Sequence, residues 1–256
     1  MNRIHLIEFH EQSWVPSILR DCVTDYLRTA MHIGGQYRLI VPLVSSIIEE
    51  TQTEMVLDLG SGAGGAWPDL LPGVRQSTGR PVRVRLSDQD PNLPAWREHA
   101  RASRGAIDYV EEAVDARRVS YDGLRTMFNL FHHFRETDAR QILADADQQQ
   151  EPILIIEAMD KSWIQGILIV LLAPIMVLLL TPLIRPFRWG RLVFTYLIPI
   201  VPLMVAWDGL VSVIRLYSIE SLRGMTSDLA HMNWEAGKIK EKNLVVMYLK
   251  GLPASA

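Results

Sequence analysis

The sequence lacks most features that mark secreted, repetitive or nucleic-acid-binding proteins. Its one cysteine, Cys22, excludes an internal disulfide and suits a reducing cytoplasm. With 26 basic and 29 acidic residues, it has no excess of positive charge, so we expect no nucleic-acid partner. Internal repeats and low-complexity tracts are absent, and the first residues do not read as a secretory signal. A chain of 256 residues is long enough for one α/β domain with additions.

The most informative motif is an apolar run that leads into a glycine loop. Residues 55–59 predict a buried strand, and Gly60, Gly62 and Gly65 follow at once. Glycines at this position let the backbone turn sharply and approach a ligand closely. Their spacing also satisfies the G-x-G-x-x-G pattern of dinucleotide-binding folds. The loop alone therefore leaves open a dinucleotide, another nucleotide cofactor, or an ordinary structural turn.

Two further acidic residues follow the next predicted strands. The run 82–88 alternates like a strand and ends at Asp88, one strand-loop-helix unit after Asp58. A carboxylate there can accept hydrogen bonds from both hydroxyls of a ribose, and Asp90 is the alternative residue for this role. Asp115 follows a short third strand over 107–110. Three acids in register argue against an accidental turn.

Asp58 and the glycines after it form the pattern Asp-x-Gly-x-Gly-x-Gly, which resembles motif I of class I S-adenosylmethionine-dependent methyltransferases. The resemblance implies that the loop backbone holds the methionine part of S-adenosylmethionine and that Asp58 organises the loop. It also implies that Asp88 binds the ribose, that Asp115 accepts from the adenine amine, and that Ala116 lies against the ring. A nicotinamide-dependent oxidoreductase is the alternative enzyme, which Asp58 disfavours. The expected cofactor residues are Asp58, Gly60, Ser61, Gly62, Gly64, Asp88, Asp115, Ala116 and Asn129.

The rest of the chain predicts the remaining elements of an α/β fold. A fourth strand begins near residue 123, an amphipathic helix covers 136–149, and a fifth strand covers 152–157. Residues 234–240 and 243–250 predict an antiparallel hairpin, which looks like the last two strands of the methyltransferase fold. We therefore expect a doubly wound, mostly parallel sheet of seven strands with an N-terminal helical cap. The predicted divisions are 1–50 (cap), 51–160 (core), 161–207 (hydrophobic helical insertion) and 208–256 (remainder of the core).

Candidate catalytic residues follow the fourth and fifth strands, because ligands of open α/β sheets bind beyond the carboxyl ends of the strands. Asn129, His132, His133 and Glu157 occupy these positions. A histidine can remove the proton that an oxygen or nitrogen acceptor loses on methylation, and His132 and His133 are equal candidates. Packing or capping roles for both are the alternative, since positioning alone can drive methyl transfer.

The segment after the fifth strand is unusually apolar. Trp163 to Ile184 and Leu192 to Trp207 contain no charged residue. About 20 helical residues can cross a bilayer, so the first run is long enough and the second is short. A hairpin would export an arginine-rich tip, against the usual preference, and prolines interrupt both runs. We expect two Pro-broken helices in the cytoplasmic membrane interface; the alternative is an apolar lid or a dimer interface.

Candidate acceptor residues lie on both sides of the core. Trp14 and Tyr37 belong to the N-terminal helices that would cover the site, and Glu157 follows the fifth strand. Asp208 and Arg215 could orient a polar head, although an internal structural pair is the more economical interpretation. No repeated metal-ligand spacing is present, so no metal is expected. We expect O- or N-methylation of a small hydrophobic or lipid-like acceptor at the membrane; a membrane-tethered scaffold without turnover is the alternative outside enzymes.

Overall fold

The computed structural model describes residues 3–185, 187–242 and 244–254. The chain forms two compact units: a helical unit (Met1–Gly35 and Met159–Tyr217) and a sheet unit (Gln36–Ala158 and Ser218–Ala256). The chain therefore passes from one unit to the other after residues 35, 158 and 217, whereas the divisions predicted from the sequence follow residues 50, 160 and 207. Two predicted positions, Pro186 of the arginine-rich loop and Asn243 at the start of the last strand, lie outside the described residues.

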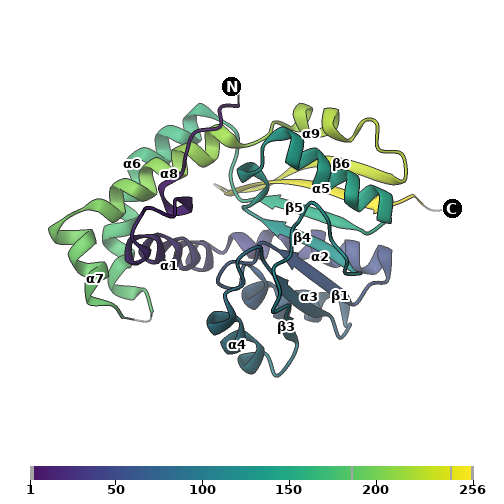
Figure 1. Ribbon diagram of the computed structural model, residues 1–256, viewed down its shortest axis with the longest axis horizontal. Helices are drawn as coiled ribbons and strands as arrows, with labels where there is room; N and C mark the ends of the chain where they lie inside the picture. The colour runs from purple at the N-terminus through teal and green to yellow at the C-terminus, as the bar shows by residue number, and fades with distance from the viewer. Residues whose placement is uncertain (1–2, 186, 243, 255–256) are drawn as a thin grey trace. The chain divides into compact units, whose positions relative to one another are not determined.

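The sheet unit contains the predicted seven-stranded sheet (Figure 1). Its strand order is β3-β2-β1-β4-β5-β7-β6, with β1 to β5 parallel and β7 antiparallel to both neighbours. The order reverses between β1 and β4, and this switch point is where open α/β sheets bind ligands. The strands are β1 (Met55–Leu59), β2 (Arg83–Ser87), β3 (Ile107–Tyr109), β4 (Leu124–Phe128), β5 (Ile153–Glu157), β6 (Met232–Glu241) and β7 (Leu244–Pro253).

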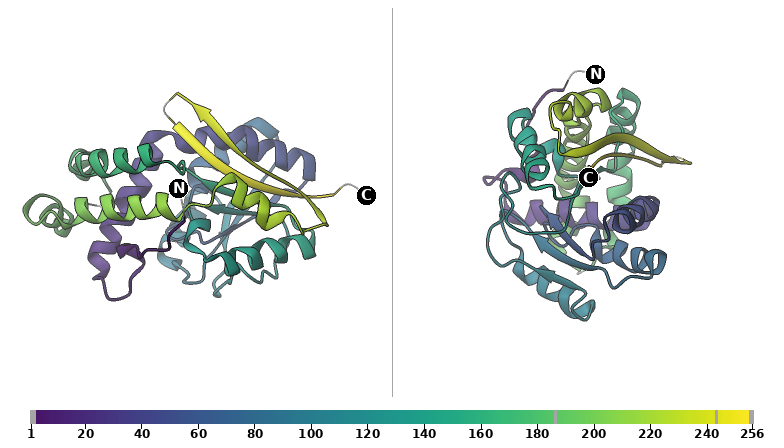
Figure 2. Two further views of the ribbon diagram at one scale, coloured as in Figure 1. Left: turned by 90° about the horizontal axis from the view of Figure 1, so that it is seen from above. Right: turned by 90° about the vertical axis from the view of Figure 1, so that its right-hand side faces the viewer.

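Helices cover both faces of this sheet. Side chains alternate between the faces along each strand, so Val56 packs with α2 to α4, whereas Arg125 reaches Asp145 on α5 at 2.8 Å. Figure 2 shows α5 and α9 on the face opposite α2 and α3. The predicted helix over 136–149 is confirmed. The helices are α2 (Gln36–Thr51), α3 (Trp67–Thr78), α4 (Leu93–Ala102), α5 (Glu136–Gln149) and α9 (Ile219–Thr226), with the short 3-10 helix η2 (Phe131–His133) after β4.

The helical unit is built around a close helix pair. Helices α6 and α8 lie side by side, and a Cβ placed on Gly209 of α8 would lie 2.7 Å from the Ile169 side chain of α6, so any other residue there would force a shift. Helix α1 packs on the pair through Val23, Val177 and Val205. The elements are η1 (Phe9–Glu11), α1 (Ser17–Gly34), α6 (Trp163–Leu180), η3 (Thr181–Leu183), α7 (Trp189–Leu192), the π-helical turn η4 (Val193–Leu197) and α8 (Ile200–Arg215).

Within the helical unit, the apolar runs form helices of different lengths. Trp163–Leu183 is long and apolar enough to cross a membrane, with a mean hydropathy of 2.7. Trp189–Leu197 and Ile200–Arg215 are long and apolar enough only when taken together, and this pair is bent by 80°. The expectation that prolines break both helices is correct for Pro182, which lies in η3 after α6, and for Pro199, which precedes α8. It is wrong for Pro174, which lies inside α6, and for Pro202, which lies inside α8.

Candidate functional site

Asp58 is the buried centre of the glycine loop. It lies near the end of β1 beside β4, and Thr126 Oγ1 donates to its Oδ1 at 2.8 Å. Ser61 Oγ donates to the other carboxylate oxygen at 2.7 Å, and Trp67 Nε1 donates to Thr126 Oγ1 at 2.9 Å. Burial raises the pKa of Asp58 to about 7, although the hydrogen bonds from Ser61 and Thr126 oppose this shift. Asp58 therefore holds the loop from inside and is not exposed to a ligand.

The loop itself requires glycine at Gly65. This residue has φ +59°, and a Cβ there would lie 2.7 Å from Asp58 Oδ2. Gly62 has φ +51° and faces open space, since no atom lies within 4 Å of the position that its Cβ would take. Because Asp58 holds the loop from the inside and Gly62 faces open space, the backbone groups of the loop are available to a ligand. Of the other predicted loop residues, Gly60 and Gly64 have positive φ, and Ser61 binds Asp58.

Asp88 stands where the sequence placed it, directly after β2. Its Oδ2 accepts from the backbone N–H of Gly62 at 2.8 Å, and its Oδ1 accepts from the N–H of Asp90 at 3.0 Å. The carboxylate is half-buried and adjoins the open side of the glycine loop. Asp90 is exposed, and its backbone N–H, not its side chain, takes part in this arrangement. Asp88 thus joins the two predicted parts of a nucleoside site.

Asp115 has a partner that the sequence analysis did not consider. Arg117 contacts both of its carboxylate oxygens, and Nη2 lies 2.8 Å from Oδ2. Arg117 also bonds Asp138 of α5 at 3.2 Å. The hydrogen bond from Arg117 holds the pKa of Asp115 below its usual value. Asp115 and the neighbouring half-buried Ala116 lie in the loop after β3, and the carboxylate is engaged by an arginine instead of standing open.

The ends of β4 and β5 are joined by polar contacts. Asn129, at φ +50°, accepts from the N–H of Ala158 at 2.7 Å. Glu157 accepts from the backbone N–H of His132 at 3.0 Å, and its second oxygen lies 2.8 Å from Nδ1 of the same histidine. Burial raises the pKa of Glu157 to about 7, while the hydrogen bond from the His132 backbone and the charge of His133 oppose the shift. These contacts distinguish the two histidines, which the sequence could not.

The remaining candidates lie at different places. Tyr37 on α2 packs edge-to-face against Phe128 of β4, at 6.3 Å between ring centroids. Trp14 belongs to the helical unit, where it contacts Phe9 edge-to-face at 6.1 Å. His133 lies against His132, with ring centroids 4.1 Å apart.

Asp208 and Arg215 lie on α8 within the helical unit. Asp208 accepts from the N–H of Phe9 at 2.6 Å, and Arg215 Nη1 lies 3.1 Å from Glu8. Both side chains therefore hold the N-terminal segment, so the structure gives each a structural role with partners that the sequence analysis did not name.

Sequence reasoning missed Thr126, Trp67, Arg117 and Ser87. Thr126 pairs in register with Asp58, and Ser87 Oγ donates to the Asp58 carbonyl at 2.8 Å. Strand order and register bring these residues to the loop, and a local sequence pattern reveals neither of them. Arg117 was within reach of sequence analysis, because it stands two residues from Asp115.

Comparisons with known proteins find similarity of fold. No family model and no curated protein matches the sequence. A plantazolicin methyltransferase solved in complex with SAH is similar with a TM-score of 0.58 at 9% identity, over 96% of this chain and 94% of that one. The S-adenosylmethionine-dependent methyltransferase SibL in its apo form gives 0.52 at 12% identity, over 87% and 57%. An O-methyltransferase family protein from Burkholderia thailandensis gives 0.50 at 16% identity, over 90% and 59%.

The chain spans less than two thirds of the length of the last two proteins. At these identities the likeness concerns the fold. The sheet order, the glycine loop after β1 and the acidic residue after β2 agree with it. The chain therefore has the fold of the class I S-adenosylmethionine-dependent methyltransferases.

Proposed function

We propose that the protein is an S-adenosylmethionine-dependent methyltransferase that acts on an oxygen or nitrogen of a small hydrophobic or lipid-like acceptor at the cytoplasmic face of a membrane. The observation that carries the proposal is the hydrogen bond from the Gly62 backbone to Asp88 at 2.8 Å. It places a half-buried carboxylate beside a glycine loop that opens to space, at the switch point of the sheet.

The residues of the sheet unit fit this cofactor. The backbone from Gly60 to Gly64 would hold its methionine part, and Asp88 would bind the ribose hydroxyls. When bound, S-adenosylmethionine supplies a methyl group on a positively charged sulfur. Asp58 supports the loop from beneath through Ser61 and Thr126. Asp115 would bind the adenine amine only after release from Arg117, a partner that the resemblance did not imply.

His132 is the better candidate for the general base. In its ionised form Glu157 favours the tautomer of His132 that carries its proton on Nδ1, and in that tautomer Nε2 is the basic nitrogen. An acceptor hydroxyl or amine that loses its proton to Nε2 becomes a stronger nucleophile for the methyl group. Glu157 also fixes the backbone of His132, so it acts as a positioning residue for the imidazole and not as the predicted contact to the acceptor.

Exposed apolar side chains support the membrane part of the proposal. Among the residues that the structure describes, every exposed large hydrophobic side chain belongs to the helical unit. On α6, Ile164 is 72% exposed and Leu179 is 63% exposed. Contiguous apolar surface of this kind marks a membrane or a protein interface. A helical unit that enters the cytoplasmic leaflet would hold the sheet unit at the membrane surface.

Calorimetric titration tests the cofactor. We expect micromolar binding of S-adenosylmethionine and none of NADH, with binding weakened by more than about tenfold in Asp88→Ala because two ribose hydrogen bonds are lost. Asp90→Ala is the matched control, since the backbone N–H that binds Asp88 remains. Binding of NADH alone, or equal affinity in wild type and Asp88→Ala, would contradict the cofactor assignment.

Acceptor and membrane are tested separately. Transfer of a labelled methyl group from S-adenosylmethionine into a membrane extract would support the acceptor class; cofactor binding without transfer would favour the scaffold. Flotation with liposomes tests the attachment. A monodisperse protein that stays in the supernatant without detergent would contradict membrane association.

A further inference from the structure

The helical unit contains a cavity of its own. The cavity has a volume of about 520 Å³, within the range of about 300–1,000 Å³ that is usual for small-molecule sites. Its walls come from the N-terminal part of the chain and from α8, and they include Phe9, Trp14, Leu19, Met204 and Trp207. Trp14, an acceptor candidate from the sequence, is part of this wall, whereas the residues assigned above to the cofactor and the base are not.

The lining indicates the chemistry of a ligand. The described wall residues are all apolar or aromatic, so the wall offers a ligand no charged partner. A hydrocarbon chain has no hydrogen bonds to lose when it moves from water into this cavity, whereas a polar group would lose its hydrogen bonds to water. Trp14 and Trp207 are 66% and 39% exposed, and indoles of this kind are common where an apolar phase meets water.

The cavity wall is continuous with the apolar surface of the same unit. Leu203 lines the cavity and is itself 66% exposed. Leu197 and Ile198, just before α8, are 77% and 48% exposed. A hydrocarbon chain that enters the cavity from a bilayer would pass these exposed apolar side chains. A bilayer is therefore a more direct source of the ligand than bulk water.

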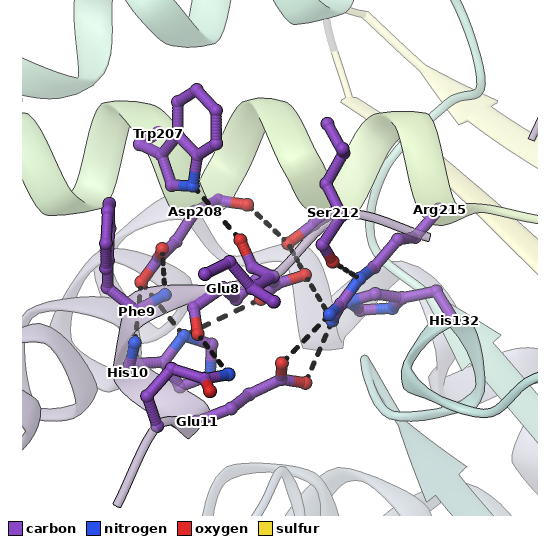
Figure 3. A network of polar contacts seen from close by, with 12 residues as sticks. Glu8, Phe9, His10, Glu11, His132, Trp207, Asp208, Ser212 and Arg215 are labelled. Atoms are coloured by element: carbon purple, nitrogen blue, oxygen red, sulfur yellow. Dashed lines mark hydrogen bonds and ion pairs between the residues drawn. The ribbon is translucent and has the colours of Figure 1, made fainter. Parts of the chain in front are cut away.

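Buried charges hold the N-terminal wall in place (Figure 3). Asp208 accepts from the backbone of Phe9 at 2.6 Å and lies 3.0 Å from Nδ1 of His10. Arg215 bonds Glu8 at 3.1 Å and Glu11 at 2.9 Å. Trp207 Nε1 donates to the carbonyl of Ile7 at 3.0 Å. Since these contacts connect the segment that carries Phe9 to α8, the cavity is formed before a ligand arrives.

We propose that this cavity binds one acyl chain of a bilayer lipid. The proposal rests on the membrane attachment included in the proposed function, but it is independent of methyl transfer. A lipid chain drawn into the helical unit would fill the space between α1 and α8 and add apolar contacts that the protein alone does not make.

Photolabelling of the full chain tests the site. The protein is placed in nanodiscs that contain phosphatidylcholine with a diazirine in one acyl chain, irradiated, and mapped by peptide mass spectrometry. We expect adducts on residues 9–19 and 200–207 that excess unlabelled phosphatidylcholine removes. Met204→Trp, which fills the cavity, should reduce these adducts by about fivefold or more. Leu171→Trp, at an exposed position of α6, is the matched control and should leave them unchanged.

Each of the other outcomes contradicts one part of the proposal. Adducts spread over α6 that do not saturate would overturn the cavity site, and this readout on the wild type stands even where Met204→Trp fails to fold. If the protein does not enter nanodiscs, the membrane attachment is wrong. In that case the protein is labelled with diazirine-labelled palmitate in detergent-free buffer. Labelling of the same peptides would overturn the bilayer as the source of the ligand. No labelling would also overturn the cavity as a site for an acyl chain.

Discussion

Nδ1 of His132 lies 2.8 Å from one carboxylate oxygen of Glu157, while the backbone N–H of the same histidine donates to the other oxygen at 3.0 Å. One buried carboxylate at the end of β5 thus fixes both the ring and the chain of a residue after β4. His133, the adjacent residue, lies against His132, with ring centroids 4.1 Å apart and ring planes tilted by 36°. This relationship separates two histidines that are equivalent in sequence.

Replacement of the two histidines should have unequal effects. His132→Ala should lower kcat by about 100-fold or more at saturating acceptor, the usual contribution of a general base. His133→Ala is the matched control and should retain most of the wild-type rate. The measurement is transfer of labelled methyl groups. Similar losses in both variants, or none in either, would refute a base role for His132.

Glu157→Gln should change the pH profile of turnover. The amide keeps the shape but no longer stabilises a protonated imidazole, so kcat should fall and the basic group should titrate at lower pH. Binding of S-adenosylmethionine, measured by calorimetry, should stay unchanged, because Glu157 holds the histidine and not the cofactor. An unaltered pH profile would show that the role of Glu157 is purely structural.

Asp58 should make stability depend on pH. Its pKa is about 7 in the folded chain and near 3.8 when unfolded, so the folded state binds more protons between these values. The stabilisation is fully present below pH 3.8 and is lost as pH rises through 7. Asp58→Asn should therefore flatten the decline in Tm from pH 4 to pH 7, with Glu157 still contributing in the same direction. Parallel Tm curves for wild type and variant would contradict the shift.

Gly65→Ala should destabilise the sheet unit. The new methyl group would meet Asp58 Oδ2 at 2.7 Å, and φ is +59°, so we expect a loss of about 1–3 kcal/mol in the free energy of unfolding. Gly79→Ala has a similar φ of +66° with nothing within 4 Å, and it reports the backbone strain alone. Denaturant titration of both variants measures the difference. Equal losses would mean that the loop relaxes around the methyl group.

Arg215→Met should be costly because it removes the guanidinium that lies 3.1 Å from Glu8, a carboxylate that is 1% exposed. Loss of one partner of a buried pair costs about 3–5 kcal/mol. The double variant with Glu8→Gln should recover part of the loss. Arg140→Met, which removes a surface pair with Asp228, should cost less than about 1 kcal/mol. Equal effects of the two arginine changes would show that the pair with Glu8 is not buried in solution.

Several elements were predictable because their signals are local. The strand that ends near Asp58 is a short apolar run, the strand before Asp88 alternates between apolar and polar residues, and the helix over 136–149 repeats its apolar residues at the helical period. The acidic residues after the strands follow from the same spacing. Arg117 stands two residues from Asp115, so this salt bridge could also have been predicted from the local sequence.

The class of fold, the glycine loop and the apolar character of α6 follow from the amino-acid sequence, since each depends on residues close together in the chain. Which side chains contact one another depends on the folded arrangement. The register of β1 and β4 places Thr126 beside Asp58. Glu157 at the end of β5 contacts His132 after β4, and Arg215 pairs with Glu8 although the two residues are far apart in the sequence. Such pairings depend on register and long-range packing, which a local pattern does not encode.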